Sequence, residues 1–132
     1  MIGADTNLIV RFLVRDDAEQ VAKVRQLFGA ADARQESVFI SDIVLCEVAW
    51  VLEKVYGLEK SAIIVAVESL LADATFGFFD RPQVEEALAA FRRLPGQFAD
   101  HLIRVVARHA GCSTTWTFDK PLAKSPDFDL LR

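Results

Sequence analysis

The sequence lacks a surplus of positive charge. Its 132 residues include 15 Lys and Arg against 19 Asp and Glu, which gives a formal net charge of −4. A strong, non-specific nucleic-acid binder carries a basic surface, so the overall composition excludes that class of protein. A nucleic-acid substrate would therefore require metal ions or a local basic patch to supply the positive charge.

Cysteine is scarce, and the common zinc- and phosphate-binding motifs are absent. Cys46 and Cys112 are not arranged as CxxC, and we expect two buried free thiols in a reducing cytoplasm. His101 and His109 lack ligand spacing with Cys or with each other, which argues against zinc. Neither GxxxxGK[ST] nor GxGxxG occurs, and no local motif supports a Ser-His-Asp triad.

Long apolar runs are missing as well. Charges interrupt each apolar stretch before it reaches the length of a membrane span, and MIGADTN is not a basic-then-apolar signal segment. We therefore expect a soluble, cytoplasmic protein with no membrane partner. The hydrophobic fraction is 52%, with ten Phe and two Trp, which is ample for a packed core. The length predicts a single domain over residues 1–132.

Strand-like and helix-like segments alternate along the chain. We expect strands at residues 2–4, 37–40, 75–79 and 113–118, with a short edge strand at 127–131. We expect helices at 6–14, from 16 or 17 to Gly29, from 41 or 42 to 56, at 59–72, after Pro82, and at 99–110. This alternation predicts an α/β fold, with a small central parallel sheet between two layers of helices. In such sheets a site lies beyond the carboxyl ends of the strands.

Four carboxylates occupy unusual places in this pattern. Asp5 and Asp119 each follow a predicted strand, and Asp100 lies in the first turn of a helix. Glu47 lies on a helix face with apolar neighbours, namely Ile43, Val44, Trp50 and Val51. Acids in such places are costly to bury unless a cation gathers them. The pattern predicts a hard divalent metal, Mg²⁺ or Mn²⁺, and hence chemistry on phosphate.

Each acid also has a structural interpretation that stays open. Asp5 can cap the helix that begins near Thr6, and Asp119 can cap a turn or helix. Asp100 suits the positive end of a helix. Glu47 can form an internal salt bridge with Lys54 or Arg11. Arg11, Arg15, Lys120 and Lys124 also lie near the predicted strand ends. Each either contacts a phosphate group or is an ordinary surface charge.

Four segments together resemble one known family. ADTNLIVRFLVRDD, VLCEVAWVLEKVYG, FADHLI and TFDK, in this order, resemble the PIN-domain ribonucleases and more closely the VapC toxins of type II toxin–antitoxin systems. The resemblance implies a three-layer α/β/α domain and a Mg²⁺- or Mn²⁺-dependent endoribonuclease. It implies a homodimer, an RNA substrate and a cognate VapB-like antitoxin.

Carried over by position, the resemblance assigns Asp5, Glu47, Asp100 and Asp119 as metal-binding and catalytic acids. Thr6 and Asn7 match the polar residues that support the first acid. His101 departs from the family pattern, since relatives commonly carry a small residue after the third acid. His101 could crowd the site, tune it or point outward.

Two rival functions remain at this point. One is a catalytically silent PIN-like binding module, held by an antitoxin or another partner. The other is a phospho-acceptor receiver domain, which is similar in size and also gathers acids at strand ends. A receiver domain needs an acid pair after the first strand, where this chain has only Asp5, and here Glu47 falls inside a predicted helix.

Overall fold

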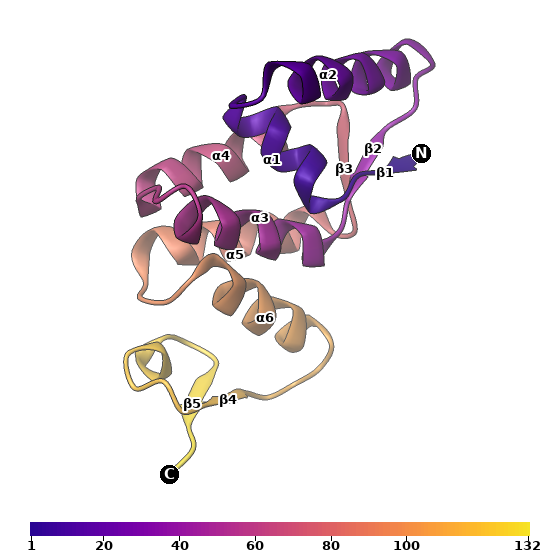
Figure 1. The fold of residues 1–132 in the computed structure, drawn as a ribbon. Helices are drawn as coiled ribbons and strands as arrows, with labels where there is room; N and C mark the ends of the chain where they lie inside the picture. The colour runs from indigo at the N-terminus through magenta and orange to yellow at the C-terminus, as the bar shows by residue number, and fades with distance from the viewer. The chain divides into compact units, whose positions relative to one another are not determined.

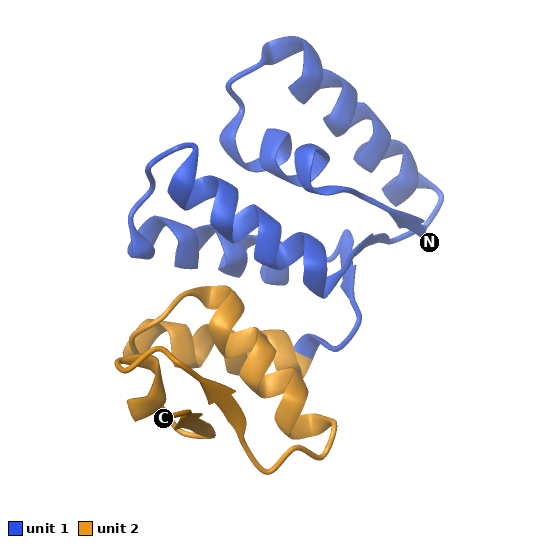
Figure 2. Ribbon diagram, turned by 60° about the horizontal axis from the view of Figure 1, so that its bottom comes forward, with its two compact units in different colours: residues 1–81 blue, residues 82–132 orange.

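Helices alternate with short parallel strands along residues 1–132, all of which the computed structural model describes (Figure 1). The predicted α/β class is therefore confirmed. Residues 1–81 form one compact unit and residues 82–132 form a second (Figure 2). Whether both belong to one domain stays a prediction, and each unit is described by itself below.

The N-terminal unit is built on a parallel sheet of three strands. β1 (Ile2–Gly3) pairs with β2 (Val38–Ile40), and β2 pairs with β3 (Phe76–Phe78), in the order β1-β2-β3. Ile2 lies opposite Val38, which lies opposite Phe76. The crossovers between strands contain α1 (Thr6–Val14), α2 (Ala18–Ala33), α3 (Asp42–Lys54) and α4 (Lys60–Ala72).

The core of this unit joins the middle strand to its helices. Val38 and Ile40 are fully buried, as the position of β2 between two strands requires. α1 packs against α2 and α3, and α3 packs against α4. The rings of Phe12, Phe28 and Phe76, from α1, α2 and β3, lie 5.3 to 5.5 Å apart at tilted or edge-on angles. Such pairs each add about 0.5–1.5 kcal/mol beyond their buried area.

The C-terminal unit contains two helices and a parallel strand pair. α5 (Arg81–Arg93) and α6 (Phe98–His109) precede β4 (Thr115–Thr117), the 3₁₀ turn η1 (Leu122–Lys124) and β5 (Phe128–Leu130). β5 pairs only with β4, which confirms the predicted short edge strand in the tail. Phe91 of α5 meets Phe98 of α6 edge-on at 6.2 Å. The five strands thus form two sheets, of three and two strands.

Two local predictions are wrong. α2 continues through Gly29 to Ala33, because Phe28 and Ala31 are buried on its inner face and outweigh the cost of about 1 kcal/mol for a helical glycine. Cys112 is exposed, because it follows the left-handed Gly111 at the end of α6, whereas Cys46 is half-buried. No helix is both long enough and apolar enough to cross a membrane.

Candidate functional site

Asp5 begins α1 directly after the first strand. The backbone N–H of Ala4 still donates to Phe39 in the sheet ladder, and Asp5 then adopts the extended conformation of a helix cap. The N–H of Leu8 donates to Asp5 Oδ1 at 3.2 Å. The capping interpretation is confirmed, and it leaves Oδ2 of this exposed carboxylate without a protein partner.

Glu47 lies on the solvent side of α3, so its expected place on an apolar, inward stripe is wrong. α3 buries Leu45, Val48, Ala49 and Leu52 on a different face, while Ile43 and Trp50 are 72% and 59% exposed. The alternative ion pairs are wrong too. Arg11 pairs with Asp16, and Lys54 pairs with Glu53.

The partner of Glu47 is instead a hydroxyl from the first helix. Thr6 Oγ1 donates to Glu47 Oε2 at 2.6 Å, which joins the first turn of α1 to the middle of α3. The other oxygen of Glu47 has no protein partner. Asn7 is exposed and shares an open hollow of about 390 Å³ with Asp5. Thr6 therefore orients Glu47, a contact that no local sequence pattern signals.

A second network fixes how α1 meets the end of α3. Tyr56 Oη donates to Asp16 Oδ2 at 2.9 Å and accepts from Arg11 Nη1 at 2.8 Å. The hydrogen bond from Tyr56 lowers the pKa of Asp16, and the contact with Tyr56 raises the pKa of Arg11. Arg11 also donates to Gln20, so its guanidinium is already occupied. Sequence reasoning missed Tyr56, which lies 45 residues from Arg11.

Asp100 is the third residue of α6 and belongs to a capping box. The N–H of Gln97 donates to Asp100 Oδ2 at 2.8 Å, while the side chain of Gln97 accepts from the backbone of Asp100. Asp100 is half-buried, and its Oδ1 has no protein partner. The helix-start interpretation is confirmed, and the carboxylate keeps one oxygen for another role.

Asp119 caps the 3₁₀ turn two residues after β4. The N–H of Leu122 donates to Asp119 Oδ1 at 2.9 Å, and the N–H of Asp119 is held by Thr117 Oγ1 at 3.0 Å. The side chain is exposed, and its Oδ2 is unengaged. In all four acids, one oxygen thus fixes the side chain and the other faces no protein donor.

Gly96 lies where the start of α6, which carries Asp100, meets the turn that follows Asp119, inside the C-terminal unit. A Cβ at this position would lie 2.8 Å from Leu122 Cδ1, in the turn capped by Asp119, and 3.3 Å from Asp100 Oδ2. His101 is fully buried, with Nε2 2.9 Å from the carbonyl of Pro95. The outward orientation considered for His101 is therefore wrong, because this side chain packs under the loop that holds Gly96.

Replacing Gly96 by Ala is expected to destabilise the protein by about 2 kcal/mol or more. Its φ of 102° is a strained conformation for a residue with Cβ, and the added methyl group would displace Leu122. Urea unfolding followed by circular dichroism measures the loss. The matched control is Gly29→Ala in α2, where the new methyl group meets nothing within 4 Å and should raise stability by about 0.5–1 kcal/mol. Equal effects of the two substitutions would contradict this role of Gly96.

Acids elsewhere do not form a metal site by themselves. Burial, and then the nearby charge of Asp80, raise the pKa of Asp42 at the carboxyl ends of β2 and β3. The residue that caps α3 is Ser41 rather than Asp42, because the Oγ of Ser41 accepts a hydrogen bond from the backbone N–H of Val44. Within either unit, no three His, Cys, Asp or Glu side chains gather as a metal-binding group. Convergence of the four predicted acids therefore stays a prediction.

Comparison with known proteins matches the resemblance carried by the four segments. The sequence model of the PIN domain family covers residues 3–126. The chain is 28% identical over 120 residues to a protein named VapC ribonuclease from Aquifex aeolicus (strain VF5), which spans 91% of this chain and 88% of that protein. No solved structure matches the chain significantly.

Proposed function

We propose that this chain, which belongs to the PIN domain family, is a metal-dependent endoribonuclease that serves as the toxin of a toxin–antitoxin pair. Its similarity to a VapC ribonuclease over nine-tenths of the chain supports a nuclease. The family membership also agrees with the α/β architecture and leaves no ground for a receiver domain. Glu47 lies in the middle of α3, where a receiver domain has no use for it.

Asp5, Glu47, Asp100 and Asp119 are the proposed metal-binding and catalytic acids. The observation that carries this assignment is that a structural hydrogen bond holds each of them and leaves one carboxylate oxygen unengaged. The donors are carboxylate oxygens without Cys or His, which fits Mg²⁺ or Mn²⁺. Such an ion activates water and neutralises charge on a phosphodiester. Thr6 supports the group by orienting Glu47.

We also propose partners for this chain, from its resemblance to the VapC toxins. RNA is the substrate, a VapB-like antitoxin is the inhibitor, and the active form is a homodimer in the cytoplasm. The similarity to a VapC ribonuclease supports the RNA and antitoxin partners. The RNA sequence that is cut is left to experiment.

Removal of divalent metal is expected to abolish RNA cleavage. Because the acids supply only oxygen ligands, the purified protein should cut a mixed RNA pool in Mg²⁺ or Mn²⁺, stop in excess EDTA and recover when the metal returns. The helical circular dichroism signal should persist in EDTA, which separates lost chemistry from unfolding. Cleavage that continues at the same rate in EDTA would refute the metal-dependent mechanism. A folded protein that cuts nothing with any metal would favour the silent binding module.

A further inference from the structure

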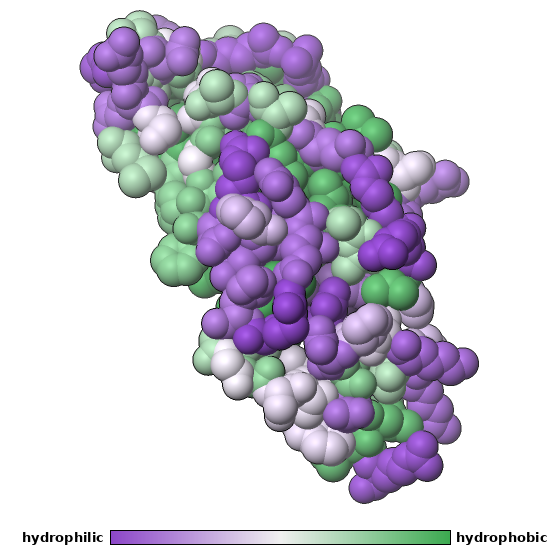
Figure 3. Space-filling model, turned by 180° about the vertical axis from the view of Figure 1, so that it is seen from behind, coloured by the Kyte–Doolittle hydropathy of each residue, from purple (hydrophilic) through white to green (hydrophobic).

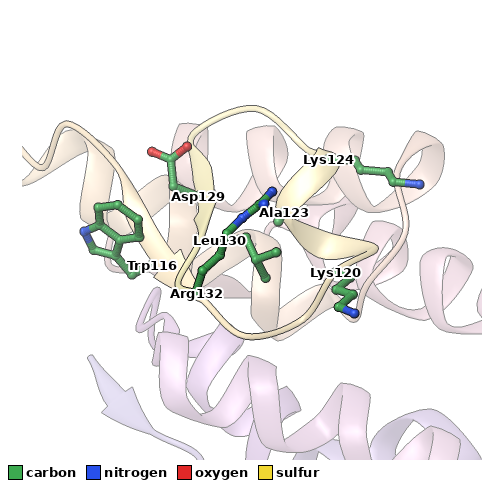
Figure 4. Close-up of a pocket in the computed structure, with 7 residues that line it drawn as sticks. All are labelled: Trp116, Lys120, Ala123, Lys124, Asp129, Leu130 and Arg132. Carbon is green, nitrogen blue, oxygen red and sulfur yellow. The ribbon is translucent and has the colours of Figure 1, made fainter.

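One hollow of the C-terminal unit combines an exposed indole with three cationic side chains. The hollow, of about 970 Å³, lies between β4, β5 and η1, and its lining includes Trp116, Lys120, Lys124, Asp129, Leu130 and Arg132 (Figure 4). In the space-filling view, hydrophilic and hydrophobic side chains meet at this end of the chain (Figure 3). An aromatic ring beside several cationic side chains is typical of surfaces that bind single-stranded nucleic acid.

Trp116 offers a free aromatic face. It is the middle residue of β4, lies opposite Asp129 of β5 and is 61% exposed. Figure 4 shows its ring projecting clear of the strand pair rather than packing on it. Thr115 and Thr117 point to the other side and are half-buried. A large ring in this position can stack on an unpaired base at no cost to the core.

The three cations are not consumed by the unit's own acids. Arg104 and Arg108 form ion pairs with Asp127, and Arg108 also pairs with Glu86. Lys120, Lys124 and Arg132 form no ion pair within this unit, and all three are exposed. Figure 4 shows Arg132 reaching across toward η1 while Lys124 extends outward. Their charges are therefore available to phosphate groups on either side of a base held by Trp116.

The charged residues of the chain are divided unevenly between the two units, and the C-terminal unit is the less acidic one. Residues 82–132 contain seven Lys and Arg against six Asp and Glu, whereas residues 1–81 contain eight against thirteen. The negative total thus comes from the N-terminal unit. This reduces the difficulty that an acidic protein poses for RNA binding, because the hollow holds three cations, Lys120, Lys124 and Arg132, against one acid, Asp129.

We propose that this hollow is a single-stranded RNA subsite, in which Trp116 stacks on one base and Lys120, Lys124 and Arg132 hold the flanking phosphates. The proposal rests on the proposed function, since Lys120 directly follows the fourth acid, Asp119, and η1 carries Lys124 from the same cap. A strand bound here runs beside that acid. A duplex cannot offer an unstacked base, so the subsite selects unpaired RNA.

Binding without cleavage tests the subsite separately from catalysis. In a Trp50→Phe background, Trp116 is the only tryptophan, and its fluorescence is titrated with a short single-stranded oligoribonucleotide in EDTA. We expect quenching on binding. Because the Trp116→Ala and Trp116→Phe variants hold no tryptophan in this background, the anisotropy of a dye-labelled oligoribonucleotide measures affinity in all of these proteins. That affinity should be about five- to a hundredfold weaker for Trp116→Ala and partly restored for Trp116→Phe, which keeps a stacking face. Unchanged circular dichroism in these variants excludes misfolding.

The charged side chains are tested by a matched pair of triple variants. Ala at Lys120, Lys124 and Arg132 should weaken binding at least tenfold and flatten its salt dependence. Ala at Arg25, Arg34 and Lys54, three exposed cations of the N-terminal unit outside the hollow beside Asp5, removes the same charge and should leave affinity within about twofold. Equal affinity of Trp116→Ala and its background, or equal loss from both triple variants, would overturn the subsite. Trp116-dependent binding without cleavage in metal would uphold the subsite and refute the proposed nuclease.

Discussion

Replacing Glu47 by Gln is expected to lower the rate of RNA cleavage on the order of 10³-fold. A bound divalent ion, which Glu47 would help to hold, contributes several kcal/mol of charge stabilisation in the transition state, and each factor of ten in rate corresponds to about 1.36 kcal/mol. Gln is isosteric and its carbonyl can still accept from Thr6, so the contact between α1 and α3 survives. The change therefore removes charge without removing structure. Single-turnover cleavage in Mg²⁺ measures the rate.

Glu53→Gln is the matched control for this experiment. It makes the same chemical change on the same helix, at a residue whose contact is the exposed Lys54. It should leave cleavage within about twofold, as expected for an exposed ion pair of small energy. In cells, induced wild-type and Glu53→Gln proteins should both arrest growth, whereas Glu47→Gln should not. Full activity of Glu47→Gln would remove this residue from the site.

Replacing Asp127 by Asn is expected to cost about 2–3 kcal/mol of stability and to lower Tm by roughly 6–12 °C. Asp127 Oδ2 lies 3.2 Å from Nη1 of Arg104, whose side chain is only 7% exposed, so the substitution leaves a buried guanidinium without its counter-charge. Asn tolerates the left-handed backbone that Asp127 adopts with φ 63°. The backbone bond from Thr115 to the carbonyl of residue 127 is also retained. Thermal unfolding at neutral pH measures the loss.

Two further variants separate the buried charge from other causes. Asp129→Asn, two residues along in the same strand region, removes an exposed charge outside the ion pairs and should change stability by no more than about 0.5 kcal/mol. Adding Arg104→Met to Asp127→Asn should recover part of the loss, because the buried Nε of Arg104 has no hydrogen-bond partner even in the native protein. A similar Tm for the Asp127→Asn and Asp129→Asn variants would contradict a buried-charge effect.

The order of elements could be predicted from sequence because local signals agree with it. Ser41, Asp17 and Gly57 sit at helix ends where caps and left-handed glycines are favoured, and the structure places them there. The end of α2 was missed because a helix stops where burial stops, and Ala31 continues the inner face beyond Gly29. The helix ends at Ala33, and Gln35 just beyond it adopts the left-handed conformation, although Gln is not a residue type that signals such a turn.

The orientation of α3 could not be predicted for a different reason. This helix carries apolar residues around most of its circumference, so periodicity offers two candidate inner faces. Packing chooses the face with Leu45, Val48 and Leu52, which places Glu47 outside, beside Thr6. The four acids were found despite this error, because three of them mark element ends and the fourth belongs to a recognisable segment.

The caps that hold Asp5 and Asp119 affect which inactive variants a cell can keep. Asn caps a helix about as well as Asp, whereas Ala forfeits about 1 kcal/mol at such a position. A loss of that size lowers the steady-state amount of a marginally stable protein, since proteases clear the unfolded fraction. Spontaneous mutants that escape growth arrest should therefore fall into two groups that differ in the cellular amount of the protein. Those with Asn at residue 5 or 119 would accumulate to normal levels and still titrate the inhibitor, while those with Ala would be depleted.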